Sequence, residues 1–310
     1  MPRTDHSSPD ACPRRAQSVA LLCLLLCVVL QSVGIGGRYL LSTFETESDI
    51  YGLLYFDWSW PEVWAQRIDD AGTLGTLLAA LPLLILYSTH RSQHARQPTT
   101  RLQSTWWIAA GLLTGMSLWA FLLALTDMVR GSTYAELALG EHAVRYCAPV
   151  ALLWAWTDCE TAEPRTAWTL LSWQLRIACA VTFAVHGWKA FHHYGPFTDL
   201  LLLSAANWGE FAFQQTQAET CLTVIGLMDL ALAVLVLLTS RRELALYMAV
   251  WGVITSLSRI TAFGWGAWPE TLLRAANWGL PLTLACLFWD RRSTISRTSS
   301  HTGQGLTLVR

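Results

Sequence analysis

The chain has 310 residues, of which 53% are hydrophobic and only 14% are charged, well below the roughly 25% charged residues of an average soluble domain. The formal net charge is −1 and the basic residues are spread over short loops, so the charge pattern argues against a nucleic-acid-binding protein. Apolar runs recur that are long enough to cross a hydrocarbon core about 30 Å thick. These features predict an all-α, polytopic membrane protein.

The first half of the chain contains four such apolar segments. We expect spanning helices at residues 17–40, 68–88, 105–127 and 143–158. Residues 1–16 form a polar, cytoplasmic N-terminal tail in this interpretation. A basic flank before an apolar run is also the pattern of a cleaved signal peptide, and this alternative stays open, although the apolar character continues to Leu41. Residues 42–66 are acidic and rich in Trp and Tyr, which is typical of a segment in the headgroup layer.

The second half also contains four apolar segments. They predict helices at residues 167–190, 219–239, 244–263 and 272–289. Residues 197–208 are apolar but too short to span, so we expect them at the interface. Gly264 to Pro269 should end the third helix of this half, and residues 290–310 should form a disordered cytoplasmic tail because they contain few apolar residues.

The distribution of basic residues predicts an orientation. With eight spans and a cytoplasmic N-terminus, the cytoplasmic segments contain thirteen of the 21 Lys and Arg residues. The positive-inside rule therefore favours two cytoplasmic termini. Short polar termini and compact loops suit a bacterial inner (plasma) membrane.

Two pairs of segments suggest an internal repeat. Residues 142–150 align without gaps on residues 274–282, and residues 75–91 align on residues 226–242. Four spans in each half would place both halves in the membrane in the same direction. We therefore expect two parallel four-helix units, at residues 17–160 and 167–289.

The second unit also resembles a known family. Its features are the stretch from His186 to Phe191 (His-Gly-Trp-Lys-Ala-Phe), the outer segment that begins at Phe197, a helix with Gly226 and Asp229, and a last helix with Pro281. Together they resemble the DoxX-like four-helix membrane proteins. Two features depart from that family, whose members are single four-helix units and more often have Glu than Asp on the second helix. The resemblance implies a link to the small subunits of quinone-linked oxidoreductases.

Two charged residues lie near the middle of predicted spans, Arg176 and Asp229. A charge at this depth is costly unless it is paired or hydrated, so such residues indicate a functional site by default. The predicted helices are consecutive and antiparallel, which would place both side chains at similar depth. They could form a structural ion pair or a polar binding site, and Arg176 could also extend alone to the cytoplasmic interface.

A second set of charges falls at or near the outer ends of the predicted helices. It suggests either a solvated rim or an outward-opening polar cavity between the halves, and it comprises Arg38, Arg67, Asp69, Asp70, Asp127, Arg130, Arg145, Lys189, Glu219, Arg259, Glu270 and Arg274. His186 and His193 are spaced seven apart, but this loose spacing beside a Gly-Pro turn favours interfacial histidines over a metal site.

The preferred hypothesis is a non-catalytic or accessory subunit that holds a lipid-soluble ligand such as a quinone. The candidate ligand-binding residues are Arg176, Asp229, Lys189, Arg259 and His186. Expected partners are a membrane lipid or quinone and a partner membrane subunit, and the sequence names no cofactor. The alternative is a secondary transporter with an outward-facing polar cavity. No hydrolase or ATPase motif occurs in the sequence.

Overall fold

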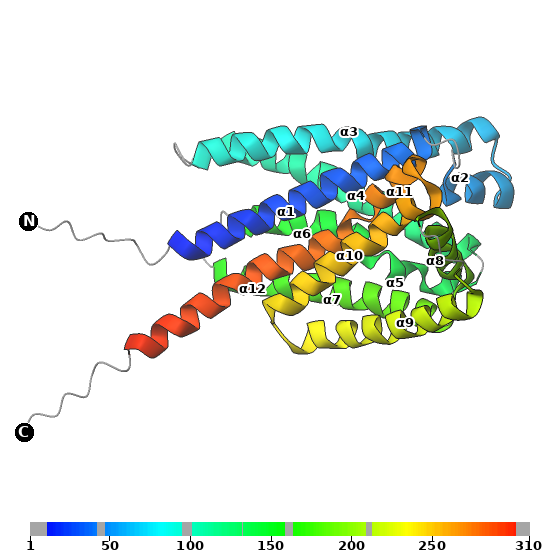
Figure 1. Ribbon diagram of the computed structural model, residues 1–310. Coiled ribbons are helices and arrows are strands. Elements are labelled where there is room, and N and C mark those ends of the chain that lie inside the picture. The colour runs from blue at the N-terminus through cyan, green and yellow to red at the C-terminus, as the bar shows by residue number, and fades with distance from the viewer. Residues whose placement is uncertain are drawn as a thin grey trace, which may run out of the picture.

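The computed structural model describes residues 11–41, 47–94, 101–131, 133–158, 164–208 and 213–301, and every regular element in these ranges is a helix (Figure 1). The all-α prediction is therefore confirmed. The long helices run along a common direction, and the start of the first lies at the same end of the bundle as the end of the last (Figure 1). They are α1 (Ala11–Gly36), α3 (Glu62–His94), α4 (Arg101–Arg130), α6 (Ala143–Asp158), α7 (Pro164–Phe191), α9 (Gln215–Leu238), α10 (Arg242–Phe263) and α12 (Ala275–His301).

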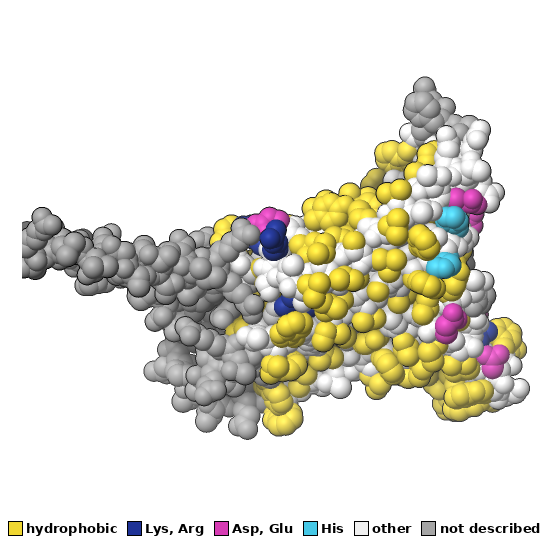
Figure 2. Space-filling view, turned by 90° about the horizontal axis from the view of Figure 1, so that it is seen from below, with side chains coloured by type: hydrophobic (Ala, Val, Ile, Leu, Met, Phe, Trp, Pro, Cys, Tyr) yellow, Lys and Arg dark blue, Asp and Glu magenta, His cyan; other side chains and the backbone are white. Residues whose placement is uncertain are grey.

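Six helices in the described part of the chain are long and apolar enough to cross a membrane. They fall within α1, α3, α4, α7, α9 and α10. Hydrophobic side chains cover most of the middle of the face in Figure 2, while charged and histidine side chains lie towards its ends. The outward side of α9 is typical, with Val224, Leu227, Val234 and Leu238 all more than half exposed. These features support a multi-pass membrane protein, and the predicted eight spans remain a prediction.

The observed helix bounds follow the predicted spans with a few differences. The helix predicted at 143–158 has these bounds in α6. By contrast, α3 begins at Glu62 instead of residue 68, because Pro61 and Glu62 are both favourable at a helix start. At the other end, α12 continues beyond residue 289 to His301, and the disordered tail stays a prediction. Residues 302–310 lie outside the described residues.

Short helical elements gather at the end of the bundle away from both chain ends (Figure 1). They are η1 (Gly37–Leu41), α2 (Asp49–Gly52), η2 (Leu53–Asp57), η3 (Ala135–Leu137), α5 (Ala138–Glu141), α8 (Gly195–Trp208), η4 (Trp265–Ala267) and α11 (Trp268–Leu273). Phe56, Trp58, Trp60 and Trp64 are exposed near α2, as expected for side chains in a headgroup layer. Gly264, at φ 78, ends α10, but the chain re-enters helix in η4 and α11, which the sequence did not predict.

The long helices of the two halves pack in corresponding pairs. α1 packs against α3 and α4 against α6, as α7 packs against α9 and α10 against α12. Across the halves, α1 packs against α12 and α6 against α7. A turn at His142 separates α5 from α6, and a turn at Arg274 separates α11 from α12 in the same way.

The main hydrophobic core lies among α1, α6, α7 and α12. Leu24, Leu152, Leu175 and Leu284 represent the four helices, and each is fully buried. By contrast, α9 and α10 make few contacts with each other. This leaves room between them for one of the two cavities described next.

Candidate ligand-binding site

A polar cavity of about 450 Å³ opens at the end of the bundle that contains α5 and α11. Both halves line it. Its charged and histidine side chains are Arg38, Asp49, Asp127, Glu141, His142, Arg145, Lys189 and Arg274.

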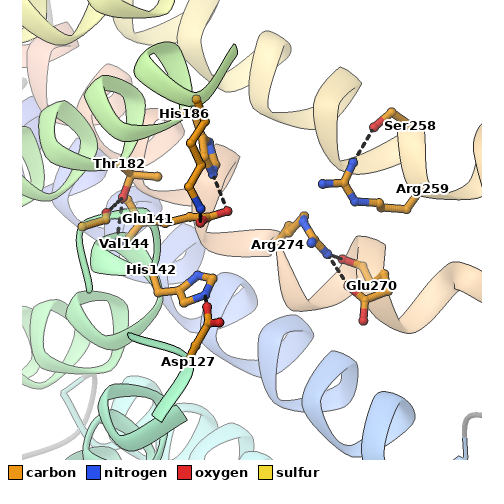
Figure 3. Close-up of polar contacts among 12 residues, drawn as sticks. Asp127, Glu141, His142, Val144, Thr182, His186, Ser258, Arg259, Glu270 and Arg274 are labelled. Carbon is orange, nitrogen blue, oxygen red and sulfur yellow. Dashed lines mark hydrogen bonds and ion pairs between the residues drawn. The ribbon is translucent and has the colours of Figure 1, made fainter. Parts of the chain in front are cut away.

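The turn between α5 and α6 is held in place by Thr182 of α7. Its hydroxyl accepts a hydrogen bond from the backbone N–H of Val144 at 3.3 Å and donates one to the carbonyl oxygen of Gly140 at 3.2 Å (Figure 3). Glu141 and His142 lie between these two points. A single hydroxyl on α7 therefore helps to fix two ionisable residues of the other half.

Two glutamates each bind two basic side chains, and Figure 3 shows Glu141 beside His186 and Glu270 beside Arg274. Glu141 accepts a hydrogen bond from Lys189 Nζ and lies 3.5 Å from His186 Nε2. Glu270 lies 3.0 Å from Arg38 Nε and 2.5 Å from an Arg274 nitrogen. The first pairing joins α5 to α7, and the second joins η1 to α11.

Charge partners keep both glutamates ionised. Burial opposes ionisation of Glu270, but Arg274 and Arg38 together lower its pKa to about 2. Burial opposes ionisation of Glu141 as well, and His186 nonetheless holds the pKa of Glu141 well below its usual value.

Arg145 has no such partner. Among the described residues its side chain forms no hydrogen bond or ion pair, and its buried Nε is unsatisfied. Its backbone is used instead: the N–H donates to the carbonyl oxygen of His142 at 2.9 Å, and the carbonyl oxygen accepts from Gln31 Nε2 at 3.0 Å. Within the described part of the chain, the polar cavity therefore contains a guanidinium that has no hydrogen-bonded or ion-paired partner.

A second cavity, of about 160 Å³, lies between α7, α8, α9, α10 and α12. We call it the Asp229 pocket. Apolar side chains such as Leu222, Ile225 and Ile254 form most of its wall, and Arg274 lines both this pocket and the polar cavity.

Three polar atoms in the wall of the Asp229 pocket lack hydrogen-bond partners. They are Asp229 Oδ1, Asn277 Oδ1 and the indole nitrogen of Trp251. Asp229 and Asn277 are each only 5% exposed. The indole lies beside the Asp229 carboxyl without reaching hydrogen-bond geometry. Buried polar groups are nearly always paired in proteins, so three unpaired atoms around one cavity need an explanation.

Four of the five predicted ligand-binding residues lie at the two cavities. Asp229, Arg259 and His186 line the Asp229 pocket, and Lys189 lines the polar cavity. Arg259 also donates a hydrogen bond to Ser258 Oγ at 3.1 Å (Figure 3). Lys189 is 4% exposed and hydrogen-bonded to Glu141.

Arg176 lies elsewhere, and its predicted ion pair with Asp229 is wrong. Its guanidinium donates to the carbonyl oxygens of Val236 at 2.7 Å, Leu237 at 2.5 Å and Thr239 at 3.0 Å. These carbonyls belong to the C-terminal end of α9, where helix carbonyls lack intrahelical partners. A cation there also interacts favourably with the helix dipole. Arg176 lines neither cavity.

The predicted set of outer charges divides into two groups. Arg38, Asp127, Arg145, Lys189 and Arg274 line the polar cavity. Others form local contacts away from it: Asp69 accepts hydrogen bonds from Ser48, and Arg130 Nε lies 2.8 Å from Asp57. His193 contacts Thr223 Oγ1 at 2.8 Å, and no group of metal-ligating side chains occurs among the described residues.

The sequence did not single out Glu141, His142, Trp251 or Asn277 as site residues. One signal was present in the alignment of residues 142–150 with 274–282. It pairs His142 with Arg274 and Arg145 with Asn277, and all four line one of the two cavities. The segments that align between the halves therefore contribute residues to both cavities.

Comparison with protein-family models, with curated proteins and with solved structures finds no match to this chain. The resemblance to DoxX-like proteins therefore stays a prediction, and the two cavities are the basis for the proposals below.

Proposed function

We propose that the protein is a membrane-embedded binding protein, in an accessory role, for a lipid-soluble molecule such as a quinone. The observation that carries this proposal is the set of three unpaired polar atoms around the Asp229 pocket. Leaving such groups buried without partners costs free energy, and a bound ligand would recover it.

The size and chemistry of the pocket support a single-ring headgroup. A cavity of about 150 Å³ is enough to hold a benzene ring, and the Asp229 pocket measures about 160 Å³. A quinone carbonyl accepts hydrogen bonds, which the Trp251 indole and the Arg259 guanidinium can donate. A quinol hydroxyl donates hydrogen bonds, which Asp229 and Asn277 can accept. The pocket therefore offers partners to both redox states.

The test is binding of a short-tailed quinone to purified protein in lipid nanodiscs, with Asp229→Asn and Trp251→Phe as variants. We expect each variant to weaken binding about tenfold, equivalent to about 1.4 kcal/mol. Because the carboxylate of Asp229 is buried without an ion pair among the described residues and its Oδ1 accepts no hydrogen bond, Asp229→Asn should leave thermal stability unchanged or raise it. A substitution that lowers quinone affinity but leaves thermal stability unchanged identifies a residue with a binding role.

Asp70→Asn is the matched control, since Asp70 is exposed on α3 and lines neither cavity. It should bind the quinone as the wild type does. Unchanged affinity in both pocket variants would reject the quinone proposal.

The polar cavity supports a second candidate, a secondary transporter. Both halves line this cavity, as binding sites between transporter repeats are lined. Proteoliposomes with a potassium diffusion potential and a pH-sensitive dye would separate the two functions. An accessory binding protein should show no proton flux above that of empty liposomes, whereas protein-dependent flux would favour transport.

A further inference from the structure

We infer that the polar cavity binds a phosphate group, held by the guanidiniums of Arg145, Arg274 and Arg38. This site is distinct from the Asp229 pocket and does not depend on the quinone proposal.

The charges around Arg145 leave an excess of cations. The nearby basic side chains are Arg38, Arg145, Lys189, Arg259 and Arg274, and the nearby carboxylates are Glu141 and Glu270. Asp49 and Asp127 line the cavity as well: Asp49 lies 3.6 Å from Arg130, and Asp127 lies 3.2 Å from the neutral imidazole of His142. Five cations therefore face four carboxylates, and among the described residues Arg145 is a cation of this group without an ion pair, which an anion in the cavity would supply.

Arg145 also lies at an unfavourable position on its helix. It is in the first turn of α6, which begins at Ala143, and Arg274 directly precedes α12, which begins at Ala275. The N-terminus of a helix carries partial positive charge and favours anions over cations. Two arginines at two helix starts repel both the helix dipoles and each other, and an anion between them would offset this repulsion by attracting both arginines and both helix N-termini.

The donor chemistry favours phosphate over a single carboxylate. Guanidinium groups bind phosphate through paired N–H donors in a fixed fork. Arg145 has its guanidinium uncommitted, whereas Arg38 and Arg274 share one carboxylate, Glu270. At about 450 Å³ the cavity is larger than a phosphate needs. A phosphate monoester or a phospholipid headgroup therefore fits as well as the free ion.

The first experiment measures phosphate binding to the full chain in phosphatidylcholine nanodiscs, by calorimetry and by thermal unfolding at constant ionic strength. Wild-type protein should bind inorganic phosphate and unfold at a higher temperature in its presence. Arg145→Gln should bind phosphate at least tenfold more weakly than the wild type does. The affinity of Arg145→Lys should lie between those of the wild type and Arg145→Gln, because lysine keeps the charge but lacks the paired N–H donors of the guanidinium. Arg67→Gln changes an exposed arginine outside the cavity and should bind as the wild type does.

A second arm separates the two sources of phosphate. In nanodiscs that contain phosphatidic acid, native mass spectrometry should detect a lipid retained by the wild type and lost in Arg145→Gln if the source is a lipid headgroup. Binding of inorganic phosphate without lipid retention would identify the free ion. Removal of an unpaired cation should not lower the melting temperature of Arg145→Gln without ligand, so a folding defect can be told apart from lost binding.

Absence of both phosphate and phosphatidic acid binding, or equal binding by the wild type and Arg145→Gln, would overturn the inference. The Asp229→Asn variant should keep its phosphate affinity. The two variants therefore test phosphate binding in the polar cavity and quinone binding in the Asp229 pocket independently of each other.

Discussion

At the scale of single residues, His142 shows how the polar cavity alters acid–base behaviour. Its Nε2 lies 3.2 Å from Asp127, which by itself would favour the protonated imidazole. Burial has the larger and opposite effect, and the positive charge of Arg145 adds to it, so that the pKa of His142 falls to about 4. The imidazole is therefore neutral at pH 7.

This shift predicts an acid-dependent loss of stability. Between the unfolded pKa of about 6.5 and the folded pKa of about 4, the unfolded chain binds more protons than the folded protein. The free energy of unfolding should therefore fall as the pH is lowered through this window, by up to about 3 kcal/mol from this residue. Thermal unfolding in phosphate-free detergent buffer at pH 7, 5.5 and 4.5 would measure it.

Carboxylates also titrate near the lower end of this range, so the comparison must be with His142→Gln. Glutamine keeps a donor for Asp127 but does not titrate. The variant should lose less stability on acidification than the wild type does, and parallel pH profiles would show that His142 makes no contribution.

Arg176 and Asp229 show what sequence reasoning can reach at this scale. Hydropathy placed both charges inside spans and so identified them as unusual. The positions of the two residues in the sequence could not show that the long Arg176 side chain reaches the last carbonyls of α9 instead of the Asp229 carboxylate. It also gave no reason to select Glu141, which only the folded chain brings beside Lys189 and His186.

At the scale of helices, α7 and α9 approach closely at two glycines. A Cβ atom on Gly226 would lie 2.6 Å from the backbone nitrogen of Phe191 and 2.8 Å from the carbonyl oxygen of Gly187. Backbone atoms cannot move aside as a flexible side chain can. The pair of glycines therefore sets the distance between these two helices.

The glycine contact predicts opposite effects for two alanine substitutions. Gly226→Ala should lower the free energy of unfolding by about 1–3 kcal/mol, because overpacking forces the helices apart. Gly75→Ala, at the aligned position of the first half, should be neutral or stabilise by up to about 1 kcal/mol, since its Cβ meets nothing within 4 Å. Melting temperatures of the two variants in one detergent would measure the difference. Similar destabilisation of both would contradict the close approach.

Helices were easier to predict than the segments that join them. A run of apolar residues fixes a spanning segment within a few residues, as for α7 and α10, because lipid imposes a minimum length. Residues 264–273 contain Gly264, Gly266 and Pro269, which indicate a break in local sequence. In the folded protein η4 and α11 form there, because packing against α1 and α10 supports short helices that local sequence does not favour.

At the scale of the whole molecule, we infer that the chain is a duplicated four-helix unit. The halves share the order of their long helices, most of their helix pairs and the position of the turn before the last helix. Their interface is formed by α1, α6, α7 and α12, and it includes the polar cavity. α1 is central to it, since its core residues pack with those of α12 and α6. A cleaved signal peptide would not have this role, so we expect α1 to be retained in the mature protein.

A cross-link between the halves would test this arrangement and the retention of α1 together. The thiols of Cys23 in α1 and Cys286 in α12 lie beside each other, so oxidation should join them. The experiment uses a chain that keeps only these two cysteines and carries a protease site between α6 and α7. After oxidation in the membrane and cleavage, the fragments should migrate as one band without reductant and as two bands with it. Cys23→Ser should give two bands in both lanes, because it removes one sulfur and little volume. Separate bands for the unsubstituted pair would mean that α1 does not pack on α12, and the shared interface would then have to be rejected.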